Sequence, residues 1–444
     1  MTDDYQMYGD MKRIWIYIAL CWAAVACSPE EDVFTETPVG LGSVKLIKLR
    51  ADHCMMLPDG KATMKFYAEA YNILELPSYA PETDGDSIMY NPKTVRDTSL
   101  IPAGLLPEGL FRLVDNEGRE YPDFAFSTTD TRPRTLRFHL EAGELVSDEL
   151  EIRVRELPEV DYEQIEVPVI FHLLNYVGKP GYPEITITSE TVRKNIERLN
   201  DVFNGKSTTD PNGGNARITF RAAEYDNTGM SLEVPGLHVY EMPSDSTFTL
   251  DDRYRNFVFG RKTTLMYDFR NFLNIWLIYN PNGAHYVASV PNVIDDPENP
   301  IPGLTTTAMP SVYPNSATDI GFFVNVSSFL NPDRSSDAFE ISTAMARYLG
   351  CLPTLVSTLN GGNMVDGDTD FCPDTPYYYY DNLSVFKTDS TMLFTSYNVM
   401  DAYSYKNSVT VDQAARIRRC LERCPSRWMW KSRFAFTGRK EDRK

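Results

Sequence analysis

The chain has 444 residues, of which 42% are hydrophobic and 12% aromatic, so it carries enough apolar material for a sizeable core in two domains. Its formal net charge of -19 excludes nucleic acid as an expected partner, because binding to phosphates depends on Lys and Arg. An acidic surface suits a soluble face held away from an anionic membrane, and equally a surface whose charge only maintains solubility.

The N-terminal segment, residues 1–27, resembles a bacterial lipoprotein signal peptide. The basic pair Lys12–Arg13 precedes an apolar run, 14–23, that is too short to span a bilayer. Small residues then lead into Cys27, as in a lipobox. We therefore expect cleavage before Cys27 and acylation of its thiol, with Met11 a better start than the first residue. The alternative is an uncleaved membrane helix.

The next segment, residues 28–43, is polar and contains proline, which is typical of a flexible tether. Its acidic cluster at 30–32 resembles the export signals that send some Gram-negative lipoproteins to the outer cell surface. We expect an outer-membrane lipoprotein that is attached through its lipid anchor and exposed at the cell surface, with the periplasmic face as the alternative.

Residues 44–157 show a period-two alternation of apolar and polar side chains, for example at 64–70, 136–140 and 151–155. Such alternation places one face of a strand in a core and the other in water. Several strands of this kind between turn-rich spacers predict an antiparallel β-sandwich of immunoglobulin-like size. Nothing in this region indicates chemistry, so we interpret it as a spacer domain.

The pattern changes after a boundary at 158–164, and a second domain is expected at 165–430. Residues 167–174 form a continuous apolar run, as in a buried central strand. The segments 217–222 and 273–279 also read as strands. Together with the helices between them, these strands predict an α+β layout.

Three helices are predicted in this second domain. The first begins at a cap formed by Thr188 or Ser189 and has apolar residues at helical spacing up to 203. The second has Asp337 and Glu340, three residues apart, as a capping-box-like start, and the last begins with Thr410 and Gln413 as a capping box.

These elements resemble, in order, the parts of a pappalysin-like metzincin, the zinc metalloprotease domain of certain bacterial lipoproteins. The resemblance implies a mixed sheet with a backing helix, an active-site helix and a Met-turn. It is carried by eight segments: 167–174, 186–204, 215–223, 272–278, 283–291, 370–376, 398–403 and 409–424.

The active-site helix of that family carries the motif HExxHxxGxxH, with three His ligands and a Glu general base. In register, the three His positions fall on Thr343, Arg347 and Pro353, and the Glu position falls on Ala344. None of these residues supplies a zinc ligand or a base, and Arg347 brings a permanent positive charge. We therefore predict a degenerate site without zinc and without peptidase activity.

The resemblance places the Met-turn at Met400. The tyrosine that assists in some relatives stands two positions further on, where this chain has Ala402, and Tyr403 comes one position later. The chain has five His, none within ligand spacing of another, and we interpret them as ordinary strand or loop residues: His53, His139, His172, His238 and His285.

Four carboxylates, Asp366, Asp368, Asp370 and Asp374, gather in one loop where relatives hold calcium. Carboxylates without imidazole favour calcium or magnesium over zinc. A calcium site is one interpretation of this loop, and a solvated acidic turn is the other.

Four cysteines lie in the C-terminal half of a chain expected to be exported, where disulfides persist. Cys420 and Cys424 share one helix end, which disfavours a bridge between them. We therefore predict two long-range disulfides that join Cys351 and Cys372 to Cys420 and Cys424 in either order. Cys54 is expected to be an unpaired, buried thiol.

Three functions remain open at this stage. The first is a pseudoprotease that binds or presents an extended peptide or protein partner along an edge strand containing Asn274, Trp276 and Ile278. The second is a zinc-dependent metalloendopeptidase with an unconventional site. The third is a structural or adhesion module whose cleft is filled by side chains.

Overall fold

In the computed structural model of the chain, the described residues are 40–78, 81–84, 87–90, 93–158, 162–206, 210–242, 265–280, 286–308, 314, 316–330, 340–354, 370–375, 386–388, 393–395, 397–401 and 406–432. The predicted signal peptide, Cys27 and almost all of the predicted tether lie outside this set. Among the described residues, no helix combines the length and apolar character needed to cross a membrane.

The chain divides into two compact units, 1–45 with 72–110, and 46–71 with 111–444. The predicted boundary at 158–164 falls inside the second unit, and the predicted domain division stays a prediction.

The first unit is built from strands. It contains the second half of a long strand, β3 (Met64–Ser78), from residue 72 onward. It also contains β6 (Lys93–Ile101), which pairs with β3 in one sheet. Between them, β4 (Pro81–Asp84) and β5 (Ser87–Tyr90) pair as an antiparallel hairpin. Two 3₁₀ helices complete this unit, η1 (Leu41–Ser43) and η2 (Ala103–Leu105).

The second unit begins with two β-sheets. In one, β1 (Leu46–Ala51) runs antiparallel to the first part of β3, and β8 (Ala125–Phe126) also pairs with β3. The other has five strands: four lie in the order β10-β9-β11-β2, and β7 also pairs with β9. The bounds of these strands are Leu145–Val146 for β10, Arg134–Ala142 for β9, Leu150–Val154 for β11, Met55–Met56 for β2 and Arg112–Asp115 for β7.

The two sheets share an apolar core. Phe66 of β3 and Phe138 of β9 come from different sheets, and their ring centroids lie 4.7 Å apart. Along β11 buried and exposed residues alternate, which confirms the period-two prediction for this strand. The immunoglobulin-like character of the region stays a prediction.

The rest of the second unit is organised around a six-stranded sheet, ordered β13-β12-β15-β19-β16, with β14 also paired to β12. All strands are parallel except β16, which pairs antiparallel with β19 at one end of the sheet. Their bounds are Ile218–Ala222 for β13, Ile165–Tyr176 for β12, Leu273–Ile278 for β15, Gly321–Asn325 for β19, Tyr286–Val287 for β16 and Leu237–Met242 for β14.

The predicted buried central strand is confirmed as β12, because it pairs on both edges and almost every one of its residues is buried. A parallel strand that is covered on both faces has a continuous apolar sequence, and the apolar run 167–174 is the pattern that predicted β12.

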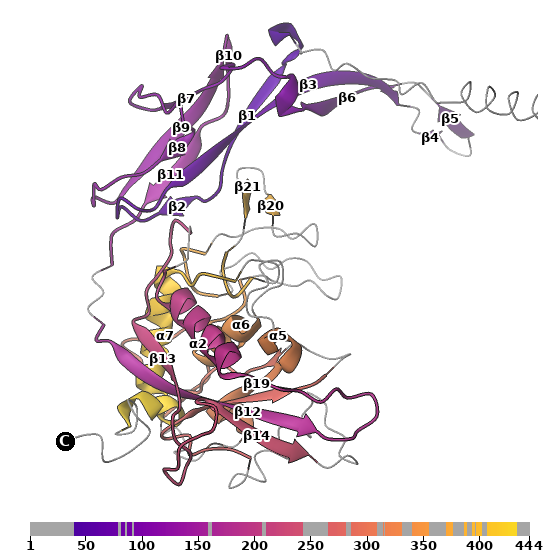
Figure 1. The fold of residues 1–444 in the computed structure, drawn as a ribbon. Coiled ribbons are helices and arrows are strands. Elements are labelled where there is room, and N and C mark those ends of the chain that lie inside the picture. Colours follow the sequence, from indigo (N-terminus) through magenta and orange to yellow (C-terminus); the bar gives the residue numbers. More distant parts are fainter. Residues whose placement is uncertain are drawn as a thin grey trace, which may run out of the picture. The chain divides into compact units, whose positions relative to one another are not determined.

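The helices gather over one face of this sheet (Figure 1). They are α2 (Ser189–Phe203), α5 (Val326–Leu330), α6 (Glu340–Tyr348) and α7 (Val411–Arg423), followed by the 3₁₀ segment η3 (Pro425–Lys431). The short helix α4 (Ala317–Ile320) is the exception, because Ala317 and Ile320 pack with Trp276 on the opposite face. Small two-stranded sheets pair β17 (Val293–Ile294) with β18 (Thr306–Thr307) and β20 (Phe386–Thr388) with β21 (Leu393–Thr395).

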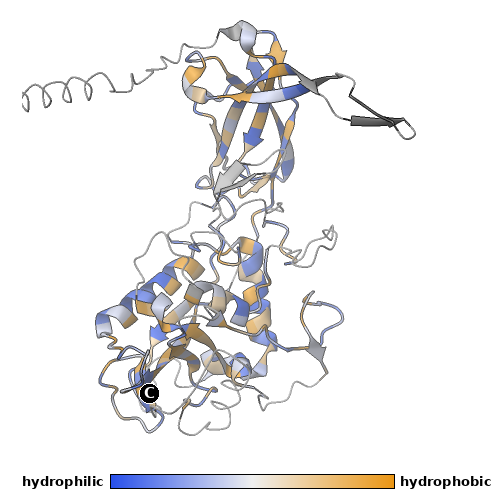
Figure 2. Cartoon of the chain, turned by 90° about the vertical axis from the view of Figure 1, so that its right-hand side faces the viewer, coloured by the Kyte–Doolittle hydropathy of each residue, from blue (hydrophilic) through white to orange (hydrophobic). Residues whose placement is uncertain are grey.

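Two helix starts agree with the sequence. Thr188 caps α2 by accepting a hydrogen bond from the Thr191 amide, and Thr410 and Gln413 form the predicted capping box of α7. The apolar stripes of α2, α6 and α7 pack with Phe171 and Leu173 of β12 in one large core. Figure 2 shows the apolar strands of this sheet beneath helices with mixed hydropathy.

Candidate functional site

The site predicted from the family motif lies on α6 and just after it. Thr343 is 3% exposed, and its hydroxyl donates a 2.7 Å hydrogen bond to the Val399 carbonyl oxygen. Ala344 is fully buried in the core. Arg347 is half-buried, and its Nε donates to the Ala288 carbonyl oxygen at 2.9 Å. Pro353 is exposed.

Beneath α6 lies the turn Asn398–Asp401. The Asn398 side chain accepts from the Met400 amide at 2.9 Å and exchanges two hydrogen bonds with the side chain of Gln413, in the capping box of α7. Met400 is 5% exposed and belongs to the same core as Ala344. The turn is therefore anchored to the start of α7, while its identity as a Met-turn stays a prediction. Ala402 and Tyr403 lie outside the described residues.

A buried lysine completes the floor of the site, and the sequence analysis missed it. Lys406 is 2% exposed, and its Nζ donates to the carbonyl oxygens of Asp401 at 2.7 Å and Val399 at 3.3 Å. Thr343 also donates to Val399, so one carbonyl oxygen binds both side chains. A lysine between polar residues in a loop gives no sequence signal of burial.

This arrangement does not fit a catalytic zinc ion. Such an ion needs three protein ligands and an open position for water, with a base nearby. Here the hydroxyl of Thr343 is used by a backbone carbonyl, Ala344 has no polar group, and a buried ammonium lies below. Across the part of the chain that the structure describes, no group of three or more His, Cys, Asp or Glu residues is arranged to hold a metal.

The acidic loop is described in part. Asp366 and Asp368 lie outside the described residues. Asp370 is buried and accepts hydrogen bonds from the Cys372 amide at 3.0 Å and the Thr375 hydroxyl at 2.9 Å. Those bonds hold the turn 370–375 together.

The last of the four predicted calcium ligands, Asp374, is committed to protein groups instead. One carboxylate oxygen accepts from the Thr410 hydroxyl at 2.6 Å. The other accepts from Arg155 Nη1 at 2.9 Å and from the Asp412 amide at 2.9 Å. Burial, and after it the charge of Asp412, raises the pKa of Asp374 to about 8.

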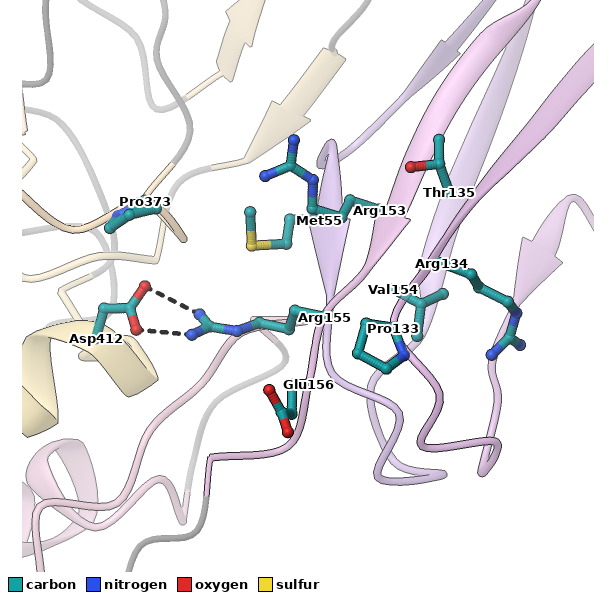
Figure 3. Close-up of a pocket in the computed structure, with 10 residues that line it drawn as sticks. All are labelled: Met55, Pro133, Arg134, Thr135, Arg153, Val154, Arg155, Glu156, Pro373 and Asp412. Carbon is teal, nitrogen blue, oxygen red and sulfur yellow. Dashed lines mark hydrogen bonds and ion pairs between the residues drawn. The ribbon is translucent and has the colours of Figure 1, made fainter.

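Arg155 directly follows β11 and forms an ion pair with Asp412 in the first turn of α7. Their charged groups lie 2.7 Å apart, and both residues line a cavity of about 530 Å³ (Figure 3). Arg155 also pairs with Asp374 at 2.9 Å. One guanidinium therefore faces two carboxylates; its charge lowers the pKa of Asp374, but burial and the charge of Asp412 outweigh it. The ion pair fixes the first turn of α7, next to the cap at Thr410.

The predicted edge strand is wrong. β15, which contains Asn274, Trp276 and Ile278, pairs with β12 on one side and β19 on the other, and all six of its residues are buried. Its backbone is therefore closed to strand addition. A continuous apolar run is typical of such an interior strand, and the edge position is taken by β16 within the later segment 283–291.

The predicted disulfides are absent from the described cysteines. All four are buried, and their sulfur atoms have other neighbours. Cys372 Sγ donates to the Asp370 carbonyl oxygen at 3.5 Å, Cys424 Sγ lies 3.3 Å from the Ser426 hydroxyl, and Cys420 Sγ packs beside Gly350.

Burial has a common chemical effect on these thiols. It raises the pKa of Cys351 and Cys372, and it raises the pKa of Cys420 to about 11. Cys54 is exposed rather than buried, because it lies in a turn between β1 and β2.

Comparison with known proteins gives a likeness of fold. The chain is similar to mature mirolysin of Tannerella forsythia, a metallopeptidase, in complex with a cleaved peptide, at 20% identity over 61% of this chain and 96% of that one, with a TM-score of 0.42. A promirolysin mutant of the same organism matches at 20% identity over 62% and 86%, with a TM-score of 0.42.

Mirolysin in complex with compound 9 matches at 20% identity over 61% of this chain and 97% of that one, with a TM-score of 0.43. No protein-family model and no curated protein matches the chain. The interpretation of the site therefore rests on this chain's own residues.

Proposed function

We propose that this chain is a pseudoprotease that binds an extended peptide without hydrolysing it. The observation that carries the proposal is the state of the motif positions: Thr343 is hydrogen-bonded to the backbone and Ala344 is buried in the core. Neither position supplies a ligand or a base, and the Lys406 ammonium beneath them repels a divalent cation.

Arg347 supports the binding part of the proposal. Its Nε is fixed by the Ala288 carbonyl oxygen, in the segment that continues β16 at the end of the sheet. Among the described residues its guanidinium forms no ion pair, and the side chain is half-exposed. Its terminal N–H groups are thus placed to donate to a peptide carbonyl or carboxylate, as a planar guanidinium does well.

The test is fluorescence anisotropy with labelled extended decapeptides, each prepared with a free and an amidated C-terminus. We expect saturable binding with intact peptide after prolonged incubation. Arg347→Met should weaken it by at least about 10-fold, because charge-assisted hydrogen bonds contribute roughly 1.5–3 kcal/mol. Arg193→Met, an exposed arginine on α2 that pairs within its own helix, is the matched control. Chelator-sensitive cleavage would sink the proposal and favour the unconventional peptidase.

The structural module with a filled cleft is the competing function. It predicts that none of these peptides binds and that Arg347→Met changes stability alone.

Location and calcium are proposals that rest on the sequence. We propose a lipid-anchored protein of the outer membrane, exposed at the cell surface, from the resemblance of residues 1–27 to a lipoprotein signal peptide. Radiolabelled palmitate incorporation that is lost in Cys27→Ala tests the anchor.

A calcium site would have to use Asp366, Asp368 or Asp370, since the oxygens of Asp374 already accept three protein donors.

A further inference from the structure

Two histidines lie side by side on the face of the sheet opposite to α6. His172 of β12 and His238 of β14 are partners in the parallel register, with ring centroids 6.2 Å apart. On β12 the neighbouring Phe171 and Leu173 pack in the core that contains α6, so His172 points to the other face. His172 is fully buried and His238 is half-buried.

The hydrogen bonds of Asn274 determine which nitrogen of His172 carries the proton. The Asn274 Nδ2 donates to the carbonyl oxygens of Tyr267 at 3.1 Å and Phe272 at 3.3 Å, which fixes the orientation of the amide. Its Oδ1 accepts from the Tyr267 amide at 2.8 Å, and His172 Nε2 lies 2.8 Å from the same oxygen. An amide oxygen only accepts, so Nε2 is the protonated nitrogen.

The second nitrogen of His172 is therefore a bare lone pair. His172 is fully buried, where the neutral ring is favoured over the charged one, and a neutral imidazole carries one ring proton only. Its Nδ1 is buried and has no hydrogen-bond partner among the residues that the structure describes. A buried acceptor without a partner carries a desolvation cost, and native structures rarely leave one unexplained.

Three further buried polar atoms around it also lack hydrogen-bond partners in the described part of the chain: His238 Nδ1, Tyr240 Oη and Tyr267 Oη. The rings that carry them are close together. The His238 centroid lies 4.2 Å from that of Tyr240 and 5.4 Å from that of Tyr267, and the His172 centroid lies 5.7 Å and 5.2 Å from the same two. Four unpartnered polar atoms on four adjoining rings thus form a cluster whose hydrogen-bonding or ligating capacity suits a bound species.

We propose that His172 and His238 bind a late first-row transition-metal ion, copper in preference to zinc, with Tyr240 and Tyr267 beside it as neutral hydroxyl groups. This proposal is independent of the pseudoprotease proposal, because it concerns the opposite face of the sheet.

The donor set decides the class of ligand. Neutral imidazole suits copper, zinc, iron and nickel, whereas calcium and magnesium require oxygen ligands. A metal–nitrogen distance of about 2.0–2.1 Å on each side fits between rings 6.2 Å apart. Two nitrogen donors fall short of the three or four protein ligands usual for zinc, while copper has the highest affinity of the divalent series.

The surroundings resemble those of a metal-binding histidine. A ligating imidazole commonly donates its other N–H to an oxygen that orients the ring, as His172 does to Asn274. Negative charge is also near, because the Asp226 carboxylate acts on both His238 and Tyr267. A tyrosine normally titrates at about pH 10, so Tyr240 and Tyr267 act as neutral hydroxyl groups at neutral pH.

The test is titration of the full chain, purified free of metal, with Cu(II) in the presence of glycine as a competing ligand. Calorimetry gives the stoichiometry, and electron paramagnetic resonance shows whether imidazole nitrogens bind the ion. We expect one copper ion per chain with nitrogen hyperfine structure. His238→Gln should weaken binding by at least about 10-fold, since loss of one ligand costs at least as much as loss of a supporting group.

His238 is the preferred substitution because it is half-buried, whereas a change at fully buried His172 can prevent folding. His139→Gln, a partly exposed histidine on β9, is the matched control and should bind copper like the parent chain. Absence of stoichiometric copper, or copper binding that His238→Gln leaves unchanged, would overturn the proposal and assign the four atoms to internal water.

Discussion

The Lys406 ammonium should stabilise the floor beneath α6, and Lys406→Met measures this directly. The substitution keeps an unbranched stem of similar length and removes the charge and its three donors. In the structure these donors hold Asp401 and Val399 by their carbonyl oxygens. After the change, the Val399 carbonyl oxygen still accepts the hydrogen bond from Thr343. The main loss is therefore the shorter of the two lysine bonds, which goes to the Asp401 carbonyl oxygen.

The expected magnitude follows from these two bonds. A hydrogen bond from a charged donor contributes about 1.5–3 kcal/mol, and the 3.3 Å bond to Val399 contributes less than the 2.7 Å bond to Asp401. Removal of a buried charge recovers part of this loss through desolvation. We expect a net destabilisation of about 2 kcal/mol, which lowers Tm by roughly 4–8 °C in a domain of this size.

Tryptophan fluorescence during thermal and urea unfolding follows the relevant region, because Trp276, Trp428 and Trp430 all lie in or beside the six-stranded sheet domain. Lys206→Met is the control, since Lys206 is exposed and lies 3.8 Å from Asp201 in a surface pair, where an effect below about 0.5 kcal/mol is expected. If the two variants unfolded at the same midpoint, the ammonium would not be stabilising the turn and the reasoning would fail.

Two further predictions follow from the surroundings of α6 and α7. The raised pKa of Asp374, about 8 in the folded chain against 3.8 normally, means that the folded state binds a proton that the unfolded state releases, so stability should fall as pH rises from 4 to 8. Asp374→Asn should flatten that dependence in urea titrations at several pH values, and an unchanged slope would contradict it. Gly350 has φ +112°, and a Cβ added there would clash with Cys420 Sγ, so Gly350→Ala should cost about 2–4 kcal/mol, and Cys420→Ala should recover part of that loss in the double variant. Full additivity of the two changes would argue against the contact.

The sequence predicted the elements whose signals are local. The caps at Thr188 and Thr410 and the apolar stripes of α2 and α7 need only side chains within one or two turns, so they could be recognised without the fold. The absence of ligand chemistry at Thr343 and Ala344 was also visible, because it depends on residue types alone.

Other features depend on contacts between distant segments. An apolar run such as 273–278 shows that a strand is buried, but its place within a sheet depends on which strands pair with both of its edges. The same limit explains the disulfides, since spacing along the chain does not reveal where each sulfur atom points. The burial of the Lys406 ammonium depends on the backbone carbonyls of Val399 and Asp401, and the tautomer of His172 depends on Asn274, 102 positions away. Neither leaves a pattern in the sequence.

Zinc content is the most direct test of the central claim that α6 carries no metal site. It should be measured by elemental analysis on the His238→Gln chain, purified without chelator, so that the histidine pair on the opposite face does not contribute. The account predicts zinc well below one ion per chain. One zinc per chain would contradict it, because the metal would then be bound by residues that the register of Thr343, Ala344, Arg347 and Pro353 does not identify.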